Sequence, residues 1–320
     1  MKLNRDLIKA TCALILSIMA HTNLKAQTAE QYFEKGQEEL GKDSLDYQKV
    51  VFYLMSAYKM DSSNVKYVNT LASVSLSLRD YPYTDYLVKR SLKLDEKQYF
   101  AYIIKASAYH AQKMFKNAIY EYGKALKRAP NDSIEQLILI NRGSSKGMMR
   151  KFDHALTDYA QAYLIDSTNT DLLNNMGNCY GEMGLHDKAL LYLKKVVQYD
   201  STYALGWGNI AFYLQRMNRF EEALPYFIKA VELDPYHPFF HNNLGYNKLM
   251  LGDTKGALKD INRSIELMPS NSYAYKNRAL VYLKKKKRKK ACADLNKAIE
   301  EGYTLSYGDE VQKLLNEHCK

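Results

Sequence analysis

Small apolar residues recur at a fixed spacing along much of the chain. Blocks rich in Ala, Leu, Lys, Glu and Tyr surround these positions with the period of an α-helix. With only six prolines and 15 glycines, the composition does not favour a strand-and-turn architecture. The pattern predicts an all-α chain built from a repeated helical unit. The spacing is 34 residues along the series Ala155, Ala189, Ala223, Ala257 and Ala291, and Ala118 lies 37 residues before the first of them.

One unit shows the repeated motif almost completely. Positions 4, 7, 8, 11, 20, 24, 27 and 32 of this 34-residue unit are Trp207, Ile210, Ala211, Leu214, Ala223, Phe227, Ala230 and Pro235. The unit before it matches through Leu173, Met176, Gly177, Tyr180, Ala189, Leu193 and Val196. The unit after it matches through His241, Leu244, Gly245, Ala257, Ile261, Ser264 and Pro269. The motif resembles the tetratricopeptide repeat, whose signature is W-x2-L-G-x2-Y, then A-x3-F, then P.

The resemblance implies an α-solenoid of about eight helix-turn-helix units in a right-handed superhelix. Small residues at positions 8, 20 and 27 are expected where the two helices of a unit approach most closely, and larger residues are expected between units. The stacked pairs would form a continuous core and offer a concave groove to a partner. Within a repeat array at 27–305, we place units at 29–64, 65–98, 99–135, 136–169, 170–203, 204–237, 238–271 and 272–305, with a capping helix at 306–320.

The first 26 residues have the layout of a secretory signal peptide. Basic residues come first, an apolar stretch follows from Ala10 to Ala20, and small residues precede Gln27. We expect residues 1–26 to be removed by cleavage after Ala26, which would place the protein in the periplasm or at the outer membrane. Because the apolar stretch is shorter than the roughly 20 residues of a membrane-spanning helix, a retained N-terminal anchor is less favoured. Full secretion is also a less favoured alternative.

A column of asparagines shares one position of the repeat. These residues occupy position 6 of the first helix, which in this family faces or borders the concave groove, and amides there can bond the backbone of an extended peptide. The column is similar to the asparagine ladder of O-linked N-acetylglucosamine transferases. The alternative is that each asparagine bonds within its own unit. The column consists of Asn141, Asn175, Asn209, Asn243 and Asn277.

Other groove-facing positions carry amides and aromatic rings in the C-terminal half. Aromatic anchors beside hydrogen-bonding amides are typical of protein-contact surfaces. Some members of the family clamp a terminal carboxylate with Lys and Asn in successive units, but Leu280 stands where the asparagine after Lys276 is required. We therefore do not expect a carboxylate clamp. The residues at positions 2, 5 and 9 are Asn174, Asn178, Phe212, Phe239, Asn242, Tyr246, Tyr273 and Lys276.

Most of the net positive charge comes from one run. The formal net charge is +11, and seven consecutive residues are basic: Lys284, Lys285, Lys286, Lys287, Arg288, Lys289 and Lys290. The run falls at the turn between the two helices of the last unit, where its second half opposes the dipole of the second helix. It is a candidate patch for an anionic membrane surface or an acidic partner, although a solvated turn is the favoured alternative. Nucleic acid is not an expected partner, because an exported protein meets little of it.

Three cysteines lie beyond the signal segment, which is too few for a disulfide framework. Cys179 is expected to be a small buried apolar residue of a first helix. If the second helix of the last unit and the capping helix are antiparallel, Cys292 and Cys319 come close to each other. An oxidising compartment would then allow them to form a disulfide.

Signatures of catalysis are missing from the sequence. It contains no G-x-S-x-G, no glycine-rich phosphate loop and no H-E-x-x-H. His237 and His241 are four residues apart, but no third ligand is evident, so a metal site is not expected. We expect no catalytic residue and no cofactor.

The sequence favours a non-catalytic scaffold or adaptor of the cell envelope that binds a protein or peptide in the concave groove. One alternative is a fixed structural subunit of an outer-membrane secretion or assembly complex, bound through its convex face. Another is a repeat module detached from a transferase, which only the asparagine column supports. The segment 290–295 and the Cys319 ending resemble those of exported repeat proteins common in Bacteroidetes. That resemblance suggests a source but no partner.

Export can be observed directly. Because the charged start, the short apolar stretch and Ala26 form a removable signal, we expect a mature N-terminus near Gln27 in the cell-envelope fraction. Mass spectrometry of N-terminal peptides is the measurement. An intact Met1 terminus on cytoplasmic protein would contradict the expected location and would make nucleic acid a partner to test for the basic run.

Overall fold

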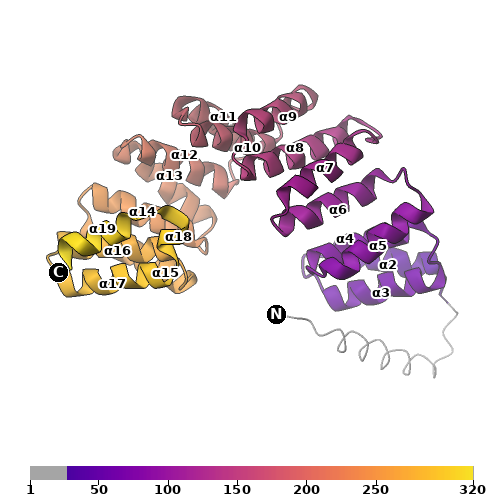
Figure 1. Cartoon of the computed structure of the whole chain (residues 1–320), viewed down its shortest axis with the longest axis horizontal. Helices are drawn as coiled ribbons and strands as arrows, with labels where there is room; N and C mark the ends of the chain where they lie inside the picture. Colours follow the sequence, from indigo (N-terminus) through magenta and orange to yellow (C-terminus); the bar gives the residue numbers. More distant parts are fainter. Residues whose placement is uncertain (1–26, 320) are drawn as a thin grey trace, which may run out of the picture. The chain divides into compact units, whose positions relative to one another are not determined.

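The computed structural model describes residues 27–319, and the regular structure of this part of the chain is entirely α-helical (Figure 1). The predicted signal peptide lies outside the described residues. None of the helices among residues 27–319 combines the length and the apolar character needed to cross a membrane. The all-α class predicted from the repeated pattern is confirmed, and the helices follow one another as the pairs of a solenoid.

The chain divides after Lys151 into two compact units. In the N-terminal unit, successive helices pair and each pair packs on the next. Its core is made of large side chains without exposed surface, among them Phe33, Leu54 and Leu87. The helices of this unit are α2 (Ala29–Leu40), α3 (Tyr47–Met60), α4 (Val65–Ser77), α5 (Tyr81–Leu94), α6 (Tyr99–Ala111), α7 (Phe115–Leu126) and α8 (Asp132–Met148).

The C-terminal unit continues the pattern and ends in two short helices. The pairs α10/α11, α12/α13, α14/α15 and α16/α17 each pack on the next, and α18 and α19 pack on α17. The helices are α9 (Phe152–Ile165), α10 (Thr170–Glu182), α11 (His186–Tyr199), α12 (Ala204–Arg216), α13 (Phe220–Leu233), α14 (Pro238–Met250), α15 (Thr254–Leu267), α16 (Ser272–Lys284), α17 (Arg288–Glu300), α18 (Tyr303–Tyr307) and α19 (Glu310–His318).

Small residues lie where the two helices of a repeat approach each other, as the pattern predicts. Ala189, Ala223 and Ala257, at position 20, have no exposed surface. At position 8, a Cβ added to Gly177 would lie only 2.7 Å from Leu193 Cγ, so the helices leave no room for a larger residue there. Thr84 replaces alanine at position 20 of an early repeat and is 1% exposed. Its hydroxyl donates to the carbonyl of Asp80 at 2.8 Å, which satisfies the polar atom inside the core.

The turn between the two helices of a repeat has the same backbone conformation in seven repeats. Position 15 is left-handed, with φ between 57° and 92°. Glycine adopts this conformation without strain, whereas in other residues the Cβ atom makes it sterically unfavourable. Only two of the seven are glycines, so helix packing imposes the turn on ordinary residues as well. The seven are Arg79, Lys113, Arg150, Gly184, Asn218, Gly252 and Lys286.

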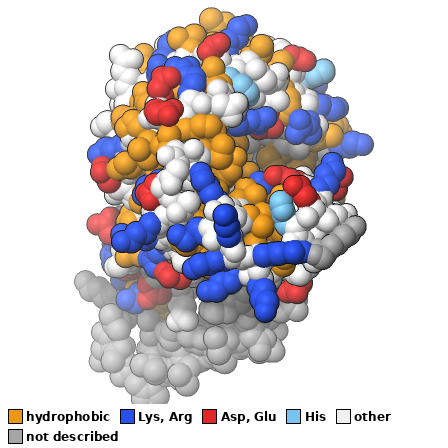
Figure 2. Space-filling model, turned by 90° about the vertical axis from the view of Figure 1, so that its left-hand side faces the viewer, with side chains coloured by type: hydrophobic (Ala, Val, Ile, Leu, Met, Phe, Trp, Pro, Cys, Tyr) orange, Lys and Arg blue, Asp and Glu red, His pale blue; other side chains and the backbone are white. Residues whose placement is uncertain are grey.

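The last repeat inverts the charge at the start of its second helix. Six of the eight second helices begin with an aspartate cap or carry an acid in the first turn. In α17 that turn holds Arg288, Lys289 and Lys290, no acid is present, and each cation opposes the helix dipole. All seven residues of the basic run are exposed, and within residues 27–319 none of them forms an ion pair. Figure 2 views the side of the C-terminal helices, where Lys and Arg side chains gather.

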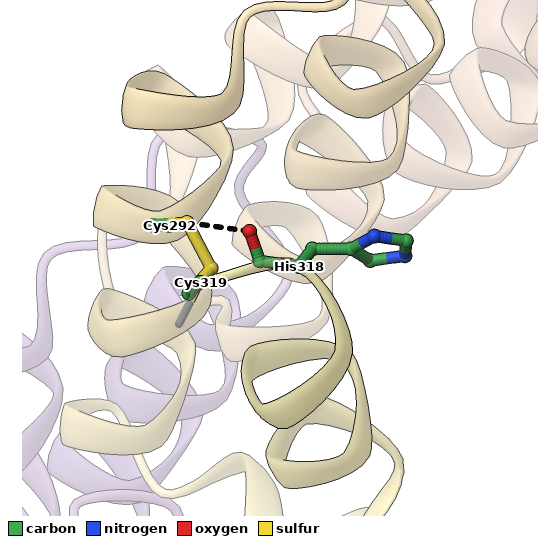
Figure 3. The surroundings of a disulfide bond; sticks show 3 residues. All are labelled: Cys292, His318 and Cys319. Atoms are coloured by element: carbon green, nitrogen blue, oxygen red, sulfur yellow. Dashed lines mark hydrogen bonds between the residues drawn. A yellow bond between two sulfur atoms is a disulfide. The ribbon is translucent and has the colours of Figure 1, made fainter.

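Two short helices, α18 and α19, form a cap over the last repeat. Tyr303 and Val311 bury against the α16/α17 pair and leave 1% and 0% of their surface exposed. A disulfide joins Cys292 in α17 to Cys319 after α19, the pairing that the sequence predicts, with the two Cα atoms 5.7 Å apart (Figure 3). The Cys292 sulfur lies 3.9 Å from the carbonyl oxygen of His318. Because a disulfide sulfur carries no hydrogen, this is a packing contact and not a hydrogen bond.

Two glycines test the close helix packing in opposite directions. In Gly245→Ala the new Cβ would lie 2.5 Å from Ile261 Cγ1 and 3.0 Å from the Ala257 carbonyl oxygen, so α14 and α15 must separate. We expect the free energy of unfolding to fall by about 1–3 kcal/mol. Gly123→Ala in α7 is the control, because a Cβ there meets nothing within 4 Å. It should raise the free energy of unfolding by up to about 1 kcal/mol. Urea unfolding compares them, and equal stabilisation by both would contradict the close approach.

The disulfide gives a second stability prediction. Cys292 and Cys319 are 27 residues apart in sequence, and reducing a bond across such a loop should cost about 3 kcal/mol of stability in the chain-entropy model. Non-reducing peptide mapping of protein from the cell envelope should give a linked peptide. Cys179 is the internal control, since it is buried and burial raises the pKa of its thiol to about 11. Only unfolded protein should be alkylated there. Free, alkylated Cys292 and Cys319 in native protein would rule out the bond.

Candidate partner-binding surface

The first helices of four successive repeats, α10, α12, α14 and α16, pack side by side in the C-terminal unit. We call the surface that they form the first-helix face. Side-chain amides link neighbouring helices of this face at two levels. Asn209 Nδ2 donates to Asn174 Oδ1 at 2.8 Å, and Asn277 Nδ2 donates to Asn242 Oδ1 at 3.0 Å. In both cases position 6 of one repeat bonds position 5 of the repeat before it.

The predicted asparagine column therefore has a structural part. Asn277 has no exposed surface and is held by the preceding repeat, so it is not presented to a partner. Asn242 Nδ2, in the same repeat, donates to Asn243 Oδ1 at 3.1 Å. Gln215 Nε2 donates to the main-chain carbonyl oxygen of Asn243, also at 3.1 Å. These bonds between repeats match neither interpretation of the column from the sequence. The two interpretations were contact with a peptide and bonding within one unit.

Three members of the column keep unused hydrogen-bonding capacity at the surface. Asn175, Asn209 and Asn243 are all half-buried. Asn209 uses one amide hydrogen and Asn243 uses its side-chain oxygen, while the side chain of Asn175 has no hydrogen-bond partner among residues 27–319. An amide offers two hydrogens and two lone pairs, so each can still bond a peptide backbone. Asn141 is half-buried too, but belongs to the N-terminal unit.

Two aromatic side chains lie on the same first helices as these amides. Phe239 is 42% exposed, and Phe212 is half-buried in an edge-to-face contact with Tyr213. The guanidinium of Arg216 lies 5.9 Å from the centroid of the Phe212 ring. Asn178 is half-buried and its oxygens are within 3.3–3.4 Å of the Tyr213 hydroxyl. These residues reach the surface at least in part, whereas Asn174 and Asn242, which are 7% and 0% exposed, do not.

The cap covers the predicted contact residues of the last repeat. Lys276 was expected to face a partner, but it is 4% exposed, and its Nζ lies 2.8 Å from a carboxylate oxygen of Glu310 in α19. The Tyr273 ring stacks on the Tyr303 ring, with 5.9 Å between their centroids, and its centroid lies 5.2 Å from that of Tyr307. Lys276 thus does bind a carboxylate, but one that belongs to its own chain.

The Glu310 carboxylate is held in its charged form. Burial alone would raise its pKa, but hydrogen bonds from Lys276 and from the Tyr303 hydroxyl outweigh burial and hold the pKa below its usual value. The Tyr303 hydroxyl donates to the other carboxylate oxygen at 2.7 Å. The only sequence signal for this contact was an acidic residue close to two tyrosines in a segment without repeat character.

The histidine pair is part of the packing. His241 contacts the carbonyl oxygen of Pro235 at 2.9 Å, and the His237 ring stacks on Phe240 with 3.9 Å between centroids. Burial lowers the pKa of His237. Among the described residues, no group of three or more His, Cys, Asp or Glu side chains could hold a metal ion.

Comparison with known proteins agrees with this geometry. The family model described as tetratricopeptide repeat matches residues 101–132, 170–203 and 204–237. No curated protein matches the chain.

Several solved structures share the fold at low sequence identity. One chain of the APC/C hetero-tetramer Cut9-Hcn1 is 15% identical with a TM-score of 0.69; the match covers 91% of this chain and 54%, about half, of that one. A tetratricopeptide repeat protein from Parabacteroides merdae is 16% identical with a TM-score of 0.53, over 92% of this chain and all of that one. Pseudomonas aeruginosa pilF is 16% identical with a TM-score of 0.57, over 67% and 96%.

The small residues at repeat positions 8 and 20 indicate tetratricopeptide repeats. The helix pairs of the structure and the matched family model indicate the same. The chain is a tetratricopeptide repeat protein.

Proposed function

We propose that the chain is an adaptor of the cell envelope that binds a protein or peptide partner on the first-helix face of its C-terminal unit. Tetratricopeptide repeat proteins are in general non-catalytic scaffolds that bind proteins or peptides. The envelope location rests on the signal-like layout of residues 1–26. The partner is expected to bind as an extended segment that crosses several first helices.

The observation that carries the proposal is the spare bonding capacity of Asn175, Asn209 and Asn243 on three adjacent helices. These amides are half-buried, lie at the same repeat position, and are spaced by 34 residues in sequence. A solenoid repeats its geometry, so the amides recur in space at a regular interval. An extended peptide exposes backbone donors and acceptors along its length, and a row of amides can bond them whatever the peptide sequence.

The asparagines can be separated into partner-facing and structural ones by substitution. Replacing Asn175, Asn209 and Asn243 together by Ala should weaken partner binding, by about 0.5–1.5 kcal/mol for each hydrogen bond lost. Helicity should stay nearly unchanged, and the melting temperature should fall only modestly, because Asn209 is the one residue of the three whose side chain bonds the preceding repeat. Crosslinking in intact cells followed by pull-down identifies the partner, and a binding titration then compares the variant with the wild type.

Asn277→Ala is the matched control, because this asparagine of the same column is buried and bonded to Asn242. It should lower the melting temperature and leave the affinity of the folded protein unchanged. If the melting temperature of the triple variant instead falls sharply while the protein that remains folded binds normally, the whole column is structural and the proposed function fails.

A further inference from the structure

The cap shows what chemistry the first-helix face accepts between the first helices of two successive repeats. We call each such place a step of the face. It places two tyrosine rings, Tyr303 and Tyr307, on the ring of Tyr273. It also places the Glu310 carboxylate on Lys276, 2.8 Å away. Lys276 in turn lies 5.1–5.7 Å from the ring centroids of Tyr273 and Tyr246. A short segment of aromatic and acidic residues therefore occupies an aromatic and cationic step of this face.

The same aromatic pair recurs one repeat earlier without a cap. Tyr246 and Tyr273 occupy position 9 of one repeat and position 2 of the next, and the preceding residues at these positions are Phe212 and Phe239. Phe239 is 42% exposed, whereas Tyr273, the residue at the same position in the next repeat, is half-buried beneath the rings of the cap. The phenylalanine step is therefore the accessible counterpart of the tyrosine step.

Arg216 supplies the positive charge at this earlier step. Position 5, where the last repeat has Lys276, is here the buried and uncharged Asn242. The Arg216 guanidinium lies 5.9 Å from the Phe212 ring instead. Arg216 also acts electrostatically on the capped step. Burial and the charge of Glu310 raise the pKa of Tyr273 to about 12, and the positive charge of Arg216 opposes that rise.

The existing ion pair of Arg216 does not prevent it from binding another carboxylate. Its partner Glu182 is 3.7 Å away, and both side chains are well exposed, at 46% and 39%. Such a surface pair contributes little stability. Arg219, by contrast, donates to both oxygens of Glu222 at 2.6 Å, a two-point contact that is stronger than the single contact of Arg216. Arg216 is thus the guanidinium near this step that a ligand can engage.

We propose that the partner segment on the first-helix face is acidic and carries an aromatic side chain, and that it docks on Phe212, Phe239 and Arg216. This inference rests on the proposed function and adds the chemistry of the ligand. The aromatic ring packs on the two phenylalanines, and the carboxylate pairs with Arg216, as the cap does one step further along.

A synthetic peptide with the sequence of residues 303–311, labelled with a fluorophore, is a direct probe. It is titrated into the mature chain with the disulfide intact, so that the cap keeps the last step occupied. We expect saturable binding that weakens with added salt. Arg216→Gln should weaken it about tenfold, the loss of one charge-assisted contact. A peptide carrying Glu310→Gln should bind as weakly, and Arg216→Gln should then cause little further loss.

Two variants of the protein control for charge and for position. Arg263 also lies 5.9 Å from an aromatic ring, that of Tyr236, but on the second helix α15, so Arg263→Gln should leave peptide affinity unchanged. Lys276→Gln should also leave it unchanged, because the cap covers that step. Dependence on Lys276 but not on Arg216 would show that the peptide displaces the cap, and would overturn the proposed site. Should Arg216→Gln fold poorly, Phe239→Ala at an exposed position gives the same test.

The outcomes for the inference and for the proposed function are distinct. If the peptide does not bind, or binds Arg216→Gln as well as wild type, the inference is overturned. The proposed function still stands in that case if the triple asparagine variant loses the partner captured from cells. If neither the asparagine variant nor the Arg216 variant affects that partner, both are overturned.

Discussion

The close approach of the two helices within each repeat is the constraint on which the rest of the structure depends. Position 8 of the first helix meets position 20 of the second with no room for a larger side chain, as at Gly245 and Ala257. Tight pairing leaves the large apolar residues to fill the space between repeats, so each pair is completed only by its neighbour. It also brings position 15 into the left-handed turn, even where the residue is Lys or Arg.

The amide bonds between first helices add a directional link to this packing. Packing of apolar side chains tolerates small slides, whereas a bond such as Asn209 to Asn174 requires a particular register of one repeat on the next. Asn209 takes part in such a bond and still keeps an unused amide hydrogen, and Asn175 and Asn243 keep unused donors or acceptors as well. The same column can therefore set the spacing of the helices and present hydrogen-bonding groups at that spacing.

The sequence was a good guide wherever a feature repeats. The spacing of Ala189, Ala223 and Ala257 was enough to predict the helix pairs, because the same contact recurs in every repeat. It was a poor guide at the C-terminal end, where Lys276 was expected to be exposed. Its burial depends on Glu310 and two tyrosines in a segment outside the repeat, and no periodicity predicts where such a segment packs. Antiparallel helix geometry predicted that Cys292 and Cys319 lie within about one helical turn of each other, and Cys319, which follows the end of α19, completes the approach.

The cap also bears on how the molecule behaves toward copies of itself. An uncovered last repeat would offer its apolar side to the first repeat of another molecule, and such a head-to-tail contact does not close on itself and can continue into a fibre. Tyr303 and Val311 cover that side, and a covalent bond holds the cover in place, so an approaching repeat would first have to displace the cap. The disulfide thus makes that side harder to uncover, in the place where a linear array is most open to stacking by another copy.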